Sequence, residues 1–417
     1  MPTTLTYDAL KAAVTGGAAA LRLTLKLEAV SPKVFPPTYE GGKYATEDRV
    51  IDKVKVPCVL LDSVPSQANR MEAALQDAYD RGEIKLPVVS VDFTAVENPG
   101  VRKITSLQAP HRIADAILRD STFGEGKTAT KFRESSIGKE LDLLHNGYAT
   151  PLLKYAPHSL VFGMWDSTGK RGGLGVKFAR ALVSEIIGVN AVMGVKTSSR
   201  IDPLGITLDA GPVFRMKDGG WTTDDKLALQ EKGKPVKFKN NADTDAKKEG
   251  KPSSINHGNI KPTLSTSAGG CTIDYAEQTT VLSLPALRRL RFPADAKTNS
   301  TPAGDLAART YLAALGLLGA VLAVDNGYDL RSRCVLHATK AVIWQLLGRP
   351  GEADTPLSLD REAALKLYAD ALAAVQASKL PIELDEVALT PTPALVGLVK
   401  KSMELTAAGI AEPAEGA

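Results

Sequence analysis

A strict alternation of apolar and polar residues over residues 20–29 constrains the fold most. Leucine occupies every second position, and the positions between are charged or polar: Leu21, Leu23, Leu25 and Leu27 alternate with Arg22, Thr24, Lys26 and Glu28. Successive side chains of a β-strand point to opposite faces, so a period of two predicts a strand with one buried face and one open face. We therefore expect a half-buried strand near the start of the chain.

The segments that follow indicate an α+β protein. Residues 54–61 and 88–93 predict two further strands, and residues 65–79 predict a helix between them with its apolar residues on one face. A β–α–β order of this kind fits an α+β sandwich such as the RRM-like (ferredoxin-like) fold. We expect this fold, with further segments inserted into it.

The rest of the chain predicts more helix than strand. Helices are expected at residues 111–119, 135–144, 177–187, 301–324, 335–347, 359–376 and 393–405, and strands at residues 159–165, 192–195, 272–280 and 281–284. The C-terminal region, residues 335–417, is therefore expected to be helical and to end in an acidic tail.

The composition describes an ordinary soluble protein. With 417 residues the chain can form one large domain with insertions or two ordinary domains. The longest apolar run, residues 311–324, is shorter than a membrane span and predicts a buried helix. No signal segment begins the chain, and Cys58, Cys271 and Cys334 lack the spacing of metal ligands. We expect a cytoplasmic protein with reduced thiols, no bound metal and no cofactor.

Charge and aromatic content favour contact with the backbone of a polyanion. The formal net charge is +4, but residues 215–261 are locally basic and residues 338–417 are locally acidic. Aromatic residues make up 5% of the chain, which is few for a protein that binds single strands by stacking on their bases. The composition therefore favours contacts to phosphates over stacking.

Residues 180–206 carry the most informative binding motif. A cluster of cationic and hydroxyl side chains surrounds a glycine-punctuated apolar run: Arg180, Lys196, Thr197, Ser198, Ser199 and Arg200. Such donors hold a phosphodiester chain without reading its bases. A helix, a loop and a strand with a solvated polar turn would explain the same residues equally well.

Two further motifs place cations together. Asn69 and Arg70 stand one turn into the predicted helix, where free N–H groups and the helix dipole favour a phosphate, although an ordinary exposed turn fits as well. Arg288, Arg289 and Arg291 project at least two guanidinium groups together on either a strand or a helix. No acidic residue lies between Glu277 and Asp295, which favours a polyanion over surface ion pairs.

The last two motifs are less specific. Arg331 and Arg333 would share one face of a strand, although Asp329 could neutralise one of them. Asn256, His257 and Asn259 surround a glycine and could hydrogen-bond to phosphate or 2′-hydroxyl groups. Because no neighbouring residue supplies a base partner for His257, we interpret it as structural or RNA-contacting rather than catalytic.

The order of these motifs resembles a known family. Segments at residues 66–72, 154–167 (KYAPHSLVFGMWDS), 254–260, 287–292 and 328–334 follow one another as in the backbone subunit of type I-G (formerly I-U) CRISPR Cascade complexes. That family belongs to the RAMP superfamily of guide-RNA-binding proteins. The resemblance covers roughly residues 21–334.

The resemblance implies a fold and a function. The palm would comprise residues 1–217 and 263–334, with finger segments inserted, and residues 218–262 would form a thumb that projects over the guide RNA. Copies of the protein would bind the crRNA backbone in a head-to-tail helical filament and present it to target DNA beside other Cascade subunits. The implied RNA-binding residues are Asn69, Arg70, Arg180, Lys196, Thr197, Ser198, Arg200, Asn256, His257, Asn259, Arg288, Arg289, Arg291, Arg331 and Arg333. No membrane partner and no catalysis are expected.

Two enzymatic alternatives remain to be weighed. Backbone subunits of related type III effectors cut RNA with a loop aspartate, and a metal-dependent nuclease of that kind would use Asp202, Asp224 or Asp225. Residues 121–128 resemble a phosphate-binding P-loop that includes Lys127. The first glycine of that motif is replaced by Ser121, and a helix-like segment precedes it where a strand is required, so we reject the P-loop.

Overall fold

The chain forms two compact units. The computed structural model describes residues 2–94, 96, 102–124, 126–168, 176–207, 209–239 and 249–407. Unit 1 comprises Met1–Val192 and Cys271–Gly397, and unit 2 comprises Met193–Gly270 and Leu398–Ala417. The insertion expected at residues 218–262 falls within the first segment of unit 2. That segment is longer than the expected insertion at both ends, since it runs from Met193 to Gly270.

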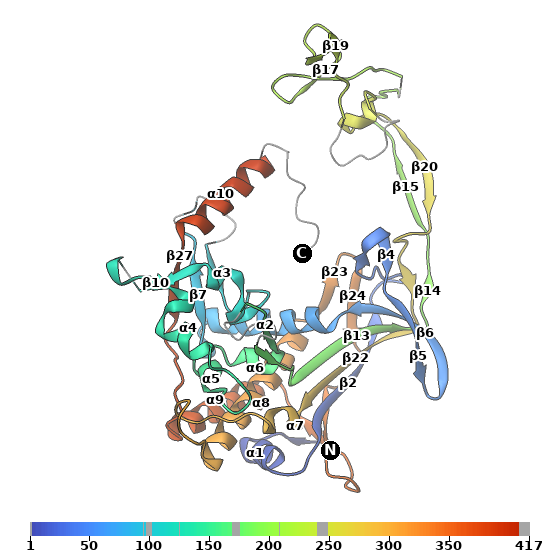
Figure 1. Cartoon of the computed structure of the whole chain (residues 1–417). Helices are drawn as coiled ribbons and strands as arrows, with labels where there is room; N and C mark the ends of the chain where they lie inside the picture. The colour runs from blue at the N-terminus through green and yellow to red at the C-terminus, as the bar shows by residue number, and fades with distance from the viewer. Residues whose placement is uncertain are drawn as a thin grey trace. The chain divides into compact units, whose positions relative to one another are not determined.

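Unit 1 is built on a ten-stranded sheet (Figure 1). Its main path has the order β1-β26-β25-β2-β22-β13-β6-β5, and β24, which pairs with β2, connects β23 to it. The strands are β1 (Thr3–Thr4), β2 (Ala20–Ala29), β5 (Thr46–Ile51), β6 (Val54–Asp62), β13 (Leu182–Val189), β22 (Tyr275–Ser283), β23 (Tyr328–Arg331), β24 (Cys334–Ala338), β25 (Ile343–Leu347) and β26 (Thr355–Ser358). Together with the helices below, this sheet confirms the α+β class.

The alternation in β2 separates the two faces of the sheet. The leucines at positions 21, 23, 25 and 27 are at most 2% exposed, whereas the polar residues at positions 24, 26 and 28 are exposed. Leu21 lies opposite Leu282 of β22, which lies opposite Leu182 of β13, so one apolar row crosses three strands. The half-buried strand predicted from the sequence is confirmed.

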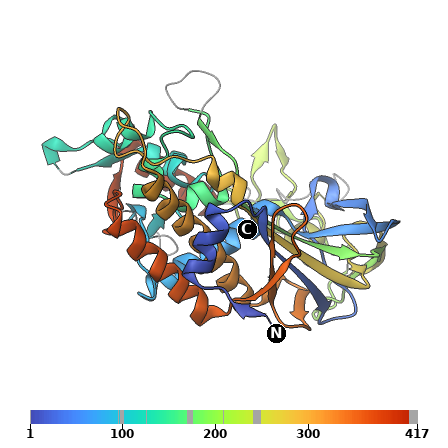
Figure 2. The same ribbon diagram turned by 90° about the horizontal axis from the view of Figure 1, so that it is seen from below.

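The apolar row packs against α8 (Pro302–Asp325). Gly316 of this helix approaches Leu182 so closely that a Cβ atom there would lie 3.2 Å from Leu182 Cδ1. The helices that pack against α8 include α1 (Tyr7–Thr15), α2 (Val64–Asp80) and α9 (Arg361–Ala377) (Figures 1 and 2). The buried helix predicted from the apolar run is confirmed. By length and composition α8 could cross a membrane, but 78% of its most apolar window is buried within the protein.

A second, smaller sheet and several short elements complete unit 1. The five-stranded sheet has the order β10-β9-β27-β7-β8. Its strands are β10 (Thr130–Lys131), β9 (Ser121–Phe123), β27 (Val387–Pro391), β7 (Val89–Asp92) and β8 (Lys103–Thr105). The short elements include α3 (Ala116–Arg119), α4 (Ser136–Leu141), α5 (Thr150–Tyr155), α6 (His158–Phe162), α7 (Leu284–Arg288), β11 (Met164–Asp166) and β12 (Val176–Phe178). Helix α10 (Pro393–Ala407) follows β27.

The helix predicted at residues 177–187 is wrong. This segment forms β12 and most of β13, a strand that pairs with β22 on one side and with β6 on the other. The last four residues of β13 are all buried, so the strand lacks the alternation that marks a half-exposed strand. A short apolar run of this kind does not distinguish a buried strand from a helix by periodicity.

Two other predictions are wrong, because a predicted helix is strand and a predicted strand is mainly helix. The helix expected at residues 335–347 is replaced by β24 and β25, and the buried and exposed positions of β24 alternate as in a strand. The C-terminal region 335–417 is therefore not wholly helical. The strand expected at residues 159–165 is mainly α6, which begins after Pro157, followed by β11. The helices expected at residues 111–119 and 135–144 are confirmed only as short turns of helix.

Unit 2 is rich in short antiparallel pairs. Strand β15 (Lys196–Arg200) pairs with β20 (Ile260–Ser265), and nearly all residues of both strands are exposed. Two small hairpins lie between them in sequence: β16 (Phe214–Arg215) pairs with β17 (Trp221–Thr222), and β18 (Gln230–Glu231) pairs with β19 (Lys234–Pro235). Within the insertion expected at residues 218–262, residues 240–248 lie outside the described residues.

Candidate nucleic-acid interface

A cleft of about 610 Å³ lies beside the first turn of α2 in unit 1. Its walls come from five segments of the chain: the start of α2, the turn around residues 110–112, the end of α6 with β11, β12 and the turn that follows it, and β13. Three of its side chains, Trp165, Lys177 and Arg180, are exposed and combine an aromatic ring with two cations. The cleft therefore presents both kinds of group that bind single-stranded nucleic acid.

The β11–β12 pair positions two of these side chains. Trp165 lies directly opposite Lys177 in the antiparallel register, so both side chains leave the pair on the same face. The tryptophan is 60% exposed, which is unusual for so large an apolar side chain. An exposed indole can stack on a base or attract a cation.

Gly163 permits the close approach of Arg180 to the cleft. The glycine has φ +88°, and a Cβ atom there would lie 2.8 Å from Arg180 Cγ. Only glycine fits this position, because the backbone conformation and the space both exclude a side chain. The guanidinium of Arg180 is exposed and forms no hydrogen bond or ion pair within the described part of the chain, so it is available to a ligand.

A buried ion pair involves one of the residues that line the cleft. Arg112 donates to both carboxylate oxygens of Glu72 at 2.6 and 2.7 Å and to the Gly163 carbonyl at 2.9 Å. Burial raises the pKa of Glu72 to about 7, although the charge and hydrogen bonds of Arg112 oppose this shift. Arg112 is therefore committed to the protein, and Lys177 and Arg180 are the cations that the cleft presents.

Two of the predicted RNA contacts, Arg70 and Arg331, converge on a buried carboxylate instead of solvent. Asp62 is 0% exposed and lies 2.9 Å from Arg70 Nε and 3.4 Å from Arg331 Nη2. Arg70 also donates to the Leu330 carbonyl at 2.6 Å, and Arg331 donates to the Leu61 carbonyl at 2.7 Å. Both guanidinium groups thus hold strands β6 and β23 and helix α2 together. Asn69, the neighbour of Arg70, is exposed.

The arginine cluster after α7 is also mostly engaged within unit 1. Arg288 donates to the carbonyls of Val14 and Ala18, and burial lowers its pKa. Arg291 lies 3.4 Å from Asp305, which is brought there by the first turns of α8. Arg289 is exposed and has no hydrogen bond or ion pair to any described residue. Of the three arginines, Arg289 alone is free to meet a phosphate.

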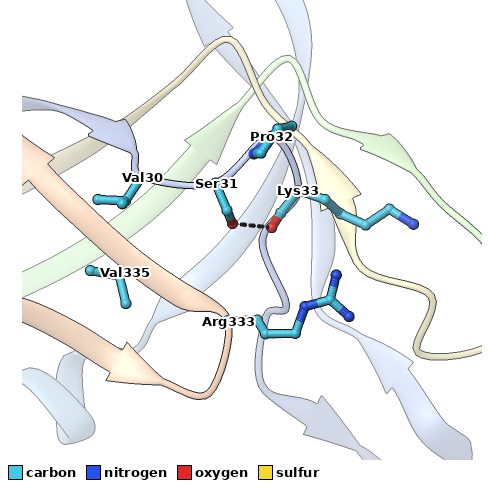
Figure 3. A pocket seen from close by; sticks show the side chains of 6 residues that line it. All are labelled: Val30, Ser31, Pro32, Lys33, Arg333 and Val335. Atoms are coloured by element: carbon cyan, nitrogen blue, oxygen red, sulfur yellow. Dashed lines mark hydrogen bonds between the residues drawn. The ribbon is translucent and has the colours of Figure 1, made fainter.

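Arg333 lies at a second basic pocket of about 420 Å³, shown in Figure 3. Its guanidinium carbon lies 4.0 Å from the centre of the Phe35 ring, so the stacked guanidinium keeps its edge free for an anion. The side chains of Lys33 and Arg333 extend toward the same side of the pocket, and Val30 and Val335 line the opposite side.

In unit 2, Asp202 organises the loop that contains the predicted RNA contacts. Its carboxylate accepts hydrogen bonds from the backbone N–H groups of Gly258 at 2.6 Å and Leu204 at 2.9 Å, and these bonds lower its pKa. Arg200 donates to the Gly258 carbonyl at 3.0 and 2.7 Å, and Asn259 accepts from the Asp202 backbone N–H at 2.6 Å. The structure thus brings Arg200 and the segment 256–259 together.

The remaining predicted contacts of unit 2 lie near or on its β-ribbon. Lys196, Thr197 and Ser198 are all exposed on β15, and the Ser198 hydroxyl lies 2.7 Å from that of Thr263. His257 Nδ1 lies 3.6 Å from the Asp202 carboxylate, and Asn256 adopts a left-handed conformation with φ +58°. These residues are placed together by the fold, but in a different unit from the cleft.

The structure describes the residues on which the two enzymatic alternatives would depend. Over the residues it describes, no group of three or more His, Cys, Asp or Glu side chains could hold a metal ion. The Asp224 side chain accepts from the Lys226 backbone N–H, which is a turn contact. At the P-loop-like segment, β9 is followed by a 3₁₀ turn at Gly126–Thr128 and by β10, without the helix that a P-loop requires.

The sequence analysis did not identify Trp165 and Lys177. Both residues lie in segments whose secondary structure was predicted wrongly, and their juxtaposition depends on the register of β11 and β12. The WDS segment after a glycine was visible as a motif, but nothing in the sequence shows that its tryptophan is exposed.

Part of the chain matches a known family. Residues 21–193 match the model of the family described as CRISPR-associated protein GSU0053. This match agrees with the predicted relationship to a CRISPR-associated family. No curated protein matches the chain. Among solved structures, the chain is similar to the crystal structure of Thermofilum pendens Csc2, with 11% identity, a TM-score of 0.29, and coverage of 89% of this chain and 90% of that chain.

Proposed function

We propose that this protein is a crRNA-binding backbone subunit of a type I CRISPR effector (Cascade) complex. Copies would line up head to tail along the spacer of the guide, in the cytoplasm, with other Cascade subunits at the ends. Each copy would grip the RNA through an RRM-like palm and through unit 2 as a thumb. The protein would hold and present the guide for target DNA pairing and would carry out no chemical step.

One observation carries this proposal: all the residues that line the cleft fall within the segment that matches the CRISPR-associated family. The family match runs from residue 21 to residue 193, and the lining residues run from Pro65 to Val183. The segment that connects the chain to this class of protein therefore also builds the basic, aromatic surface described above.

The free cations suit a guide of any sequence. Arg180, Lys177 and Arg289 are exposed and are not engaged by described residues in hydrogen bonds or ion pairs. Contacts of such side chains to phosphates carry no sequence information, so one protein can carry guides of every sequence and leave base edges free for pairing. A subunit whose contacts do not close on themselves forms an open helical assembly.

The nuclease alternative is less well supported. The Asp202 carboxylate already accepts two backbone hydrogen bonds, so fewer of its lone pairs are left for a metal ion. Incubation of the purified protein with target RNA and Mg²⁺ tests this alternative directly. Cleavage that Asp202→Asn abolishes would favour the nuclease over the purely structural subunit.

The proposed function is tested by expressing the protein with its guide. We expect RNA-containing assemblies that elute early in size-exclusion chromatography and that shorten after ribonuclease treatment. Purified RNA-free protein should bind single-stranded RNA of any sequence, and Lys177→Ala with Arg180→Ala should weaken binding. Lys366→Ala is the matched control, because this exposed lysine of α9 pairs with Asp370. A monomeric, RNA-free protein in the presence of guide would overturn the proposal.

A further inference from the structure

A separate pocket of about 280 Å³ opens on unit 1, and none of the residues assigned above to RNA lines it. Its walls are apolar and come from α8 and the β25–β26 region, with Val321, Val324 and Leu359 among them. Trp344, which is 0% exposed, also lines it. A pocket of this size accommodates an aliphatic side chain, which gains free energy by leaving water.

The rim of the pocket is acidic. Asp325 ends α8 and Asp360 caps the N-terminus of α9, and both residues line the pocket. Arg361 lies 3.7 Å from Asp325 but is shared with Glu83, so one arginine serves two carboxylates there. Asp360 has no ion pair to any residue that the structure describes. The pocket therefore favours an apolar group that carries a positive charge beside it.

Helix α10 has the complementary chemistry. Leu398 is 66% exposed and Leu405 is 37% exposed, and Lys401 lies between them, also exposed. Positions i, i+3 and i+7 fall on one face of a helix, so the three side chains form one apolar and basic stripe. In an isolated chain this stripe is exposed to solvent, and the solvent exposure of its two leucines is unfavourable.

We propose that the pocket of one copy of this protein receives Leu398 from α10 of a second copy, with Lys401 meeting Asp325 and Asp360 at the rim. The contact joins different surfaces of the two copies, so it is heterologous, and it propagates into an open chain wherever the rotation between copies does not close a ring. In the head-to-tail assembly proposed above, this contact would join neighbouring copies directly through protein. The contact itself needs no RNA, so the two proposals can fail separately.

The test uses Trp344 as an internal reporter. The protein has three tryptophans, so Trp165→Phe and Trp221→Phe leave Trp344 as the single one. Leu398→Asp is added to the full-length chain to prevent self-association, and a synthetic peptide of residues 393–407 is titrated against it. We expect a saturable change in Trp344 emission, and a peptide carrying Leu398→Asp should bind about tenfold more weakly or worse.

Charge exchange supplies the matched control. Asp325→Lys in the full-length chain should weaken the binding of the native peptide. A peptide that carries Lys401→Glu should bind this variant more tightly than the native peptide does. Val324→Phe, which takes up space in the pocket and keeps Trp344 as the single tryptophan, should abolish the response while circular dichroism remains that of the parent. The proposal is overturned if the native and Leu398→Asp peptides bind alike, if neither binds, or if butylammonium alone produces the same response at equal concentration.

In the RNA-free full-length protein, Leu398→Asp should lower the concentration-dependent self-association measured by sedimentation, and the native peptide should compete with it. Loss of this association with retained RNA binding would support the docking site independently of the proposed function. Self-association that is unchanged by Leu398→Asp would overturn it, whatever the protein does with RNA.

Discussion

Trp165 and Lys177 lie directly opposite each other in the antiparallel β11–β12 pair, so an aromatic face and an ammonium group leave the pair on the same side. The pair borders a cleft to which Arg180 adds a second cation, and neither cation has an ion pair with a residue that the structure describes. The arrangement combines one stacking surface with charge for phosphates, whereas the composition alone favoured phosphate contacts without stacking.

Replacement of Trp165 by Ala should weaken the binding of single-stranded RNA by roughly 1–3 kcal/mol, the value of one base stacked on an aromatic ring. Trp165→Phe should retain most of the affinity. Fluorescence anisotropy with a labelled RNA measures both. Binding of inorganic polyphosphate, which has no bases, should be the same for the parent and Trp165→Ala. An equal loss with polyphosphate would mean that the tryptophan shapes the site rather than stacking.

Lys177→Ala and Arg180→Ala should each reduce the salt dependence of RNA binding. One phosphate contact on a single strand contributes a slope of about 0.7 in log Kd against log salt concentration, so each variant should lose about that amount. Titrations at several salt concentrations give the slopes, with Lys366→Ala as the control. Unchanged slopes in both variants would show that the RNA follows another surface.

Arg70→Ala and Arg331→Ala should destabilise the fold. Each removes a partner from Asp62, which is 0% exposed, and an uncompensated buried charge costs about 3–5 kcal/mol when its partner is removed. Because Asp62 keeps one arginine in each single variant, the lower part of that range is expected. Urea unfolding measures the loss, and Asp62→Asn should suppress most of it in a double-mutant cycle.

Arg289→Ala is the contrasting change, since this exposed arginine has no ion pair with any residue that the structure describes. Its free energy of unfolding should stay within about 0.5 kcal/mol of the parent. If Arg70→Ala were equally mild and reduced RNA binding instead, the original expectation of a phosphate contact at Arg70 would be correct.

His158 should make the protein less stable in acid. Burial, with the nearby charge of Arg112, lowers its pKa to about 3 from an ordinary value of 6.5. The native ring stays neutral while the unfolded ring takes up a proton below pH 6.5, so stability is full above that pH and falls as the pH drops toward 3. Between pH 7 and pH 5 the loss is about 2 kcal/mol.

The measurement compares the parent with His158→Gln by urea unfolding at both pH values. Glutamine can still donate to the Ser106 carbonyl, which the ring nitrogen contacts at 3.0 Å. The raised pKa of Glu72 acts in the opposite direction, but it is present in both proteins and cancels in the difference. A variant that loses as much stability as the parent would contradict the assignment.

The sequence predicted the elements whose pattern is local. The leucines of β2 alternate regardless of what surrounds them, and the apolar length of α8 indicates burial by itself. Strand β13 was missed because its last four residues are all buried, which removes the period of two. Local periodicity therefore failed where the sheet is covered on both faces.

The site could be predicted only in outline. No acidic residue lies between Glu277 and Asp295, and from this we expected the nearby arginines to have no ion-pair partner. In the structure, however, Asp305 of the next helix lies beside Arg291. Asp62 likewise forms ion pairs with Arg70 and Arg331. Arg70 is only eight residues away along the chain, whereas Arg331 is far away in sequence and is brought to Asp62 by the fold. Whether an arginine is free depends on the fold.

The connection between β13 and β22 has a consequence for how this protein can vary. The two strands are hydrogen-bonded neighbours, with Val189 opposite Tyr275, and most of unit 2 lies between them in sequence. Topologically that segment is the loop of one very long hairpin. Because the entropy of closing a loop grows only with the logarithm of its length, about 0.6 kcal/mol per doubling, the sheet hardly responds to how much chain is inserted there. Relatives could lengthen, shorten or replace the insertion while strand order and register stay as they are, and a short turn grafted between the two strands should leave a folded unit 1.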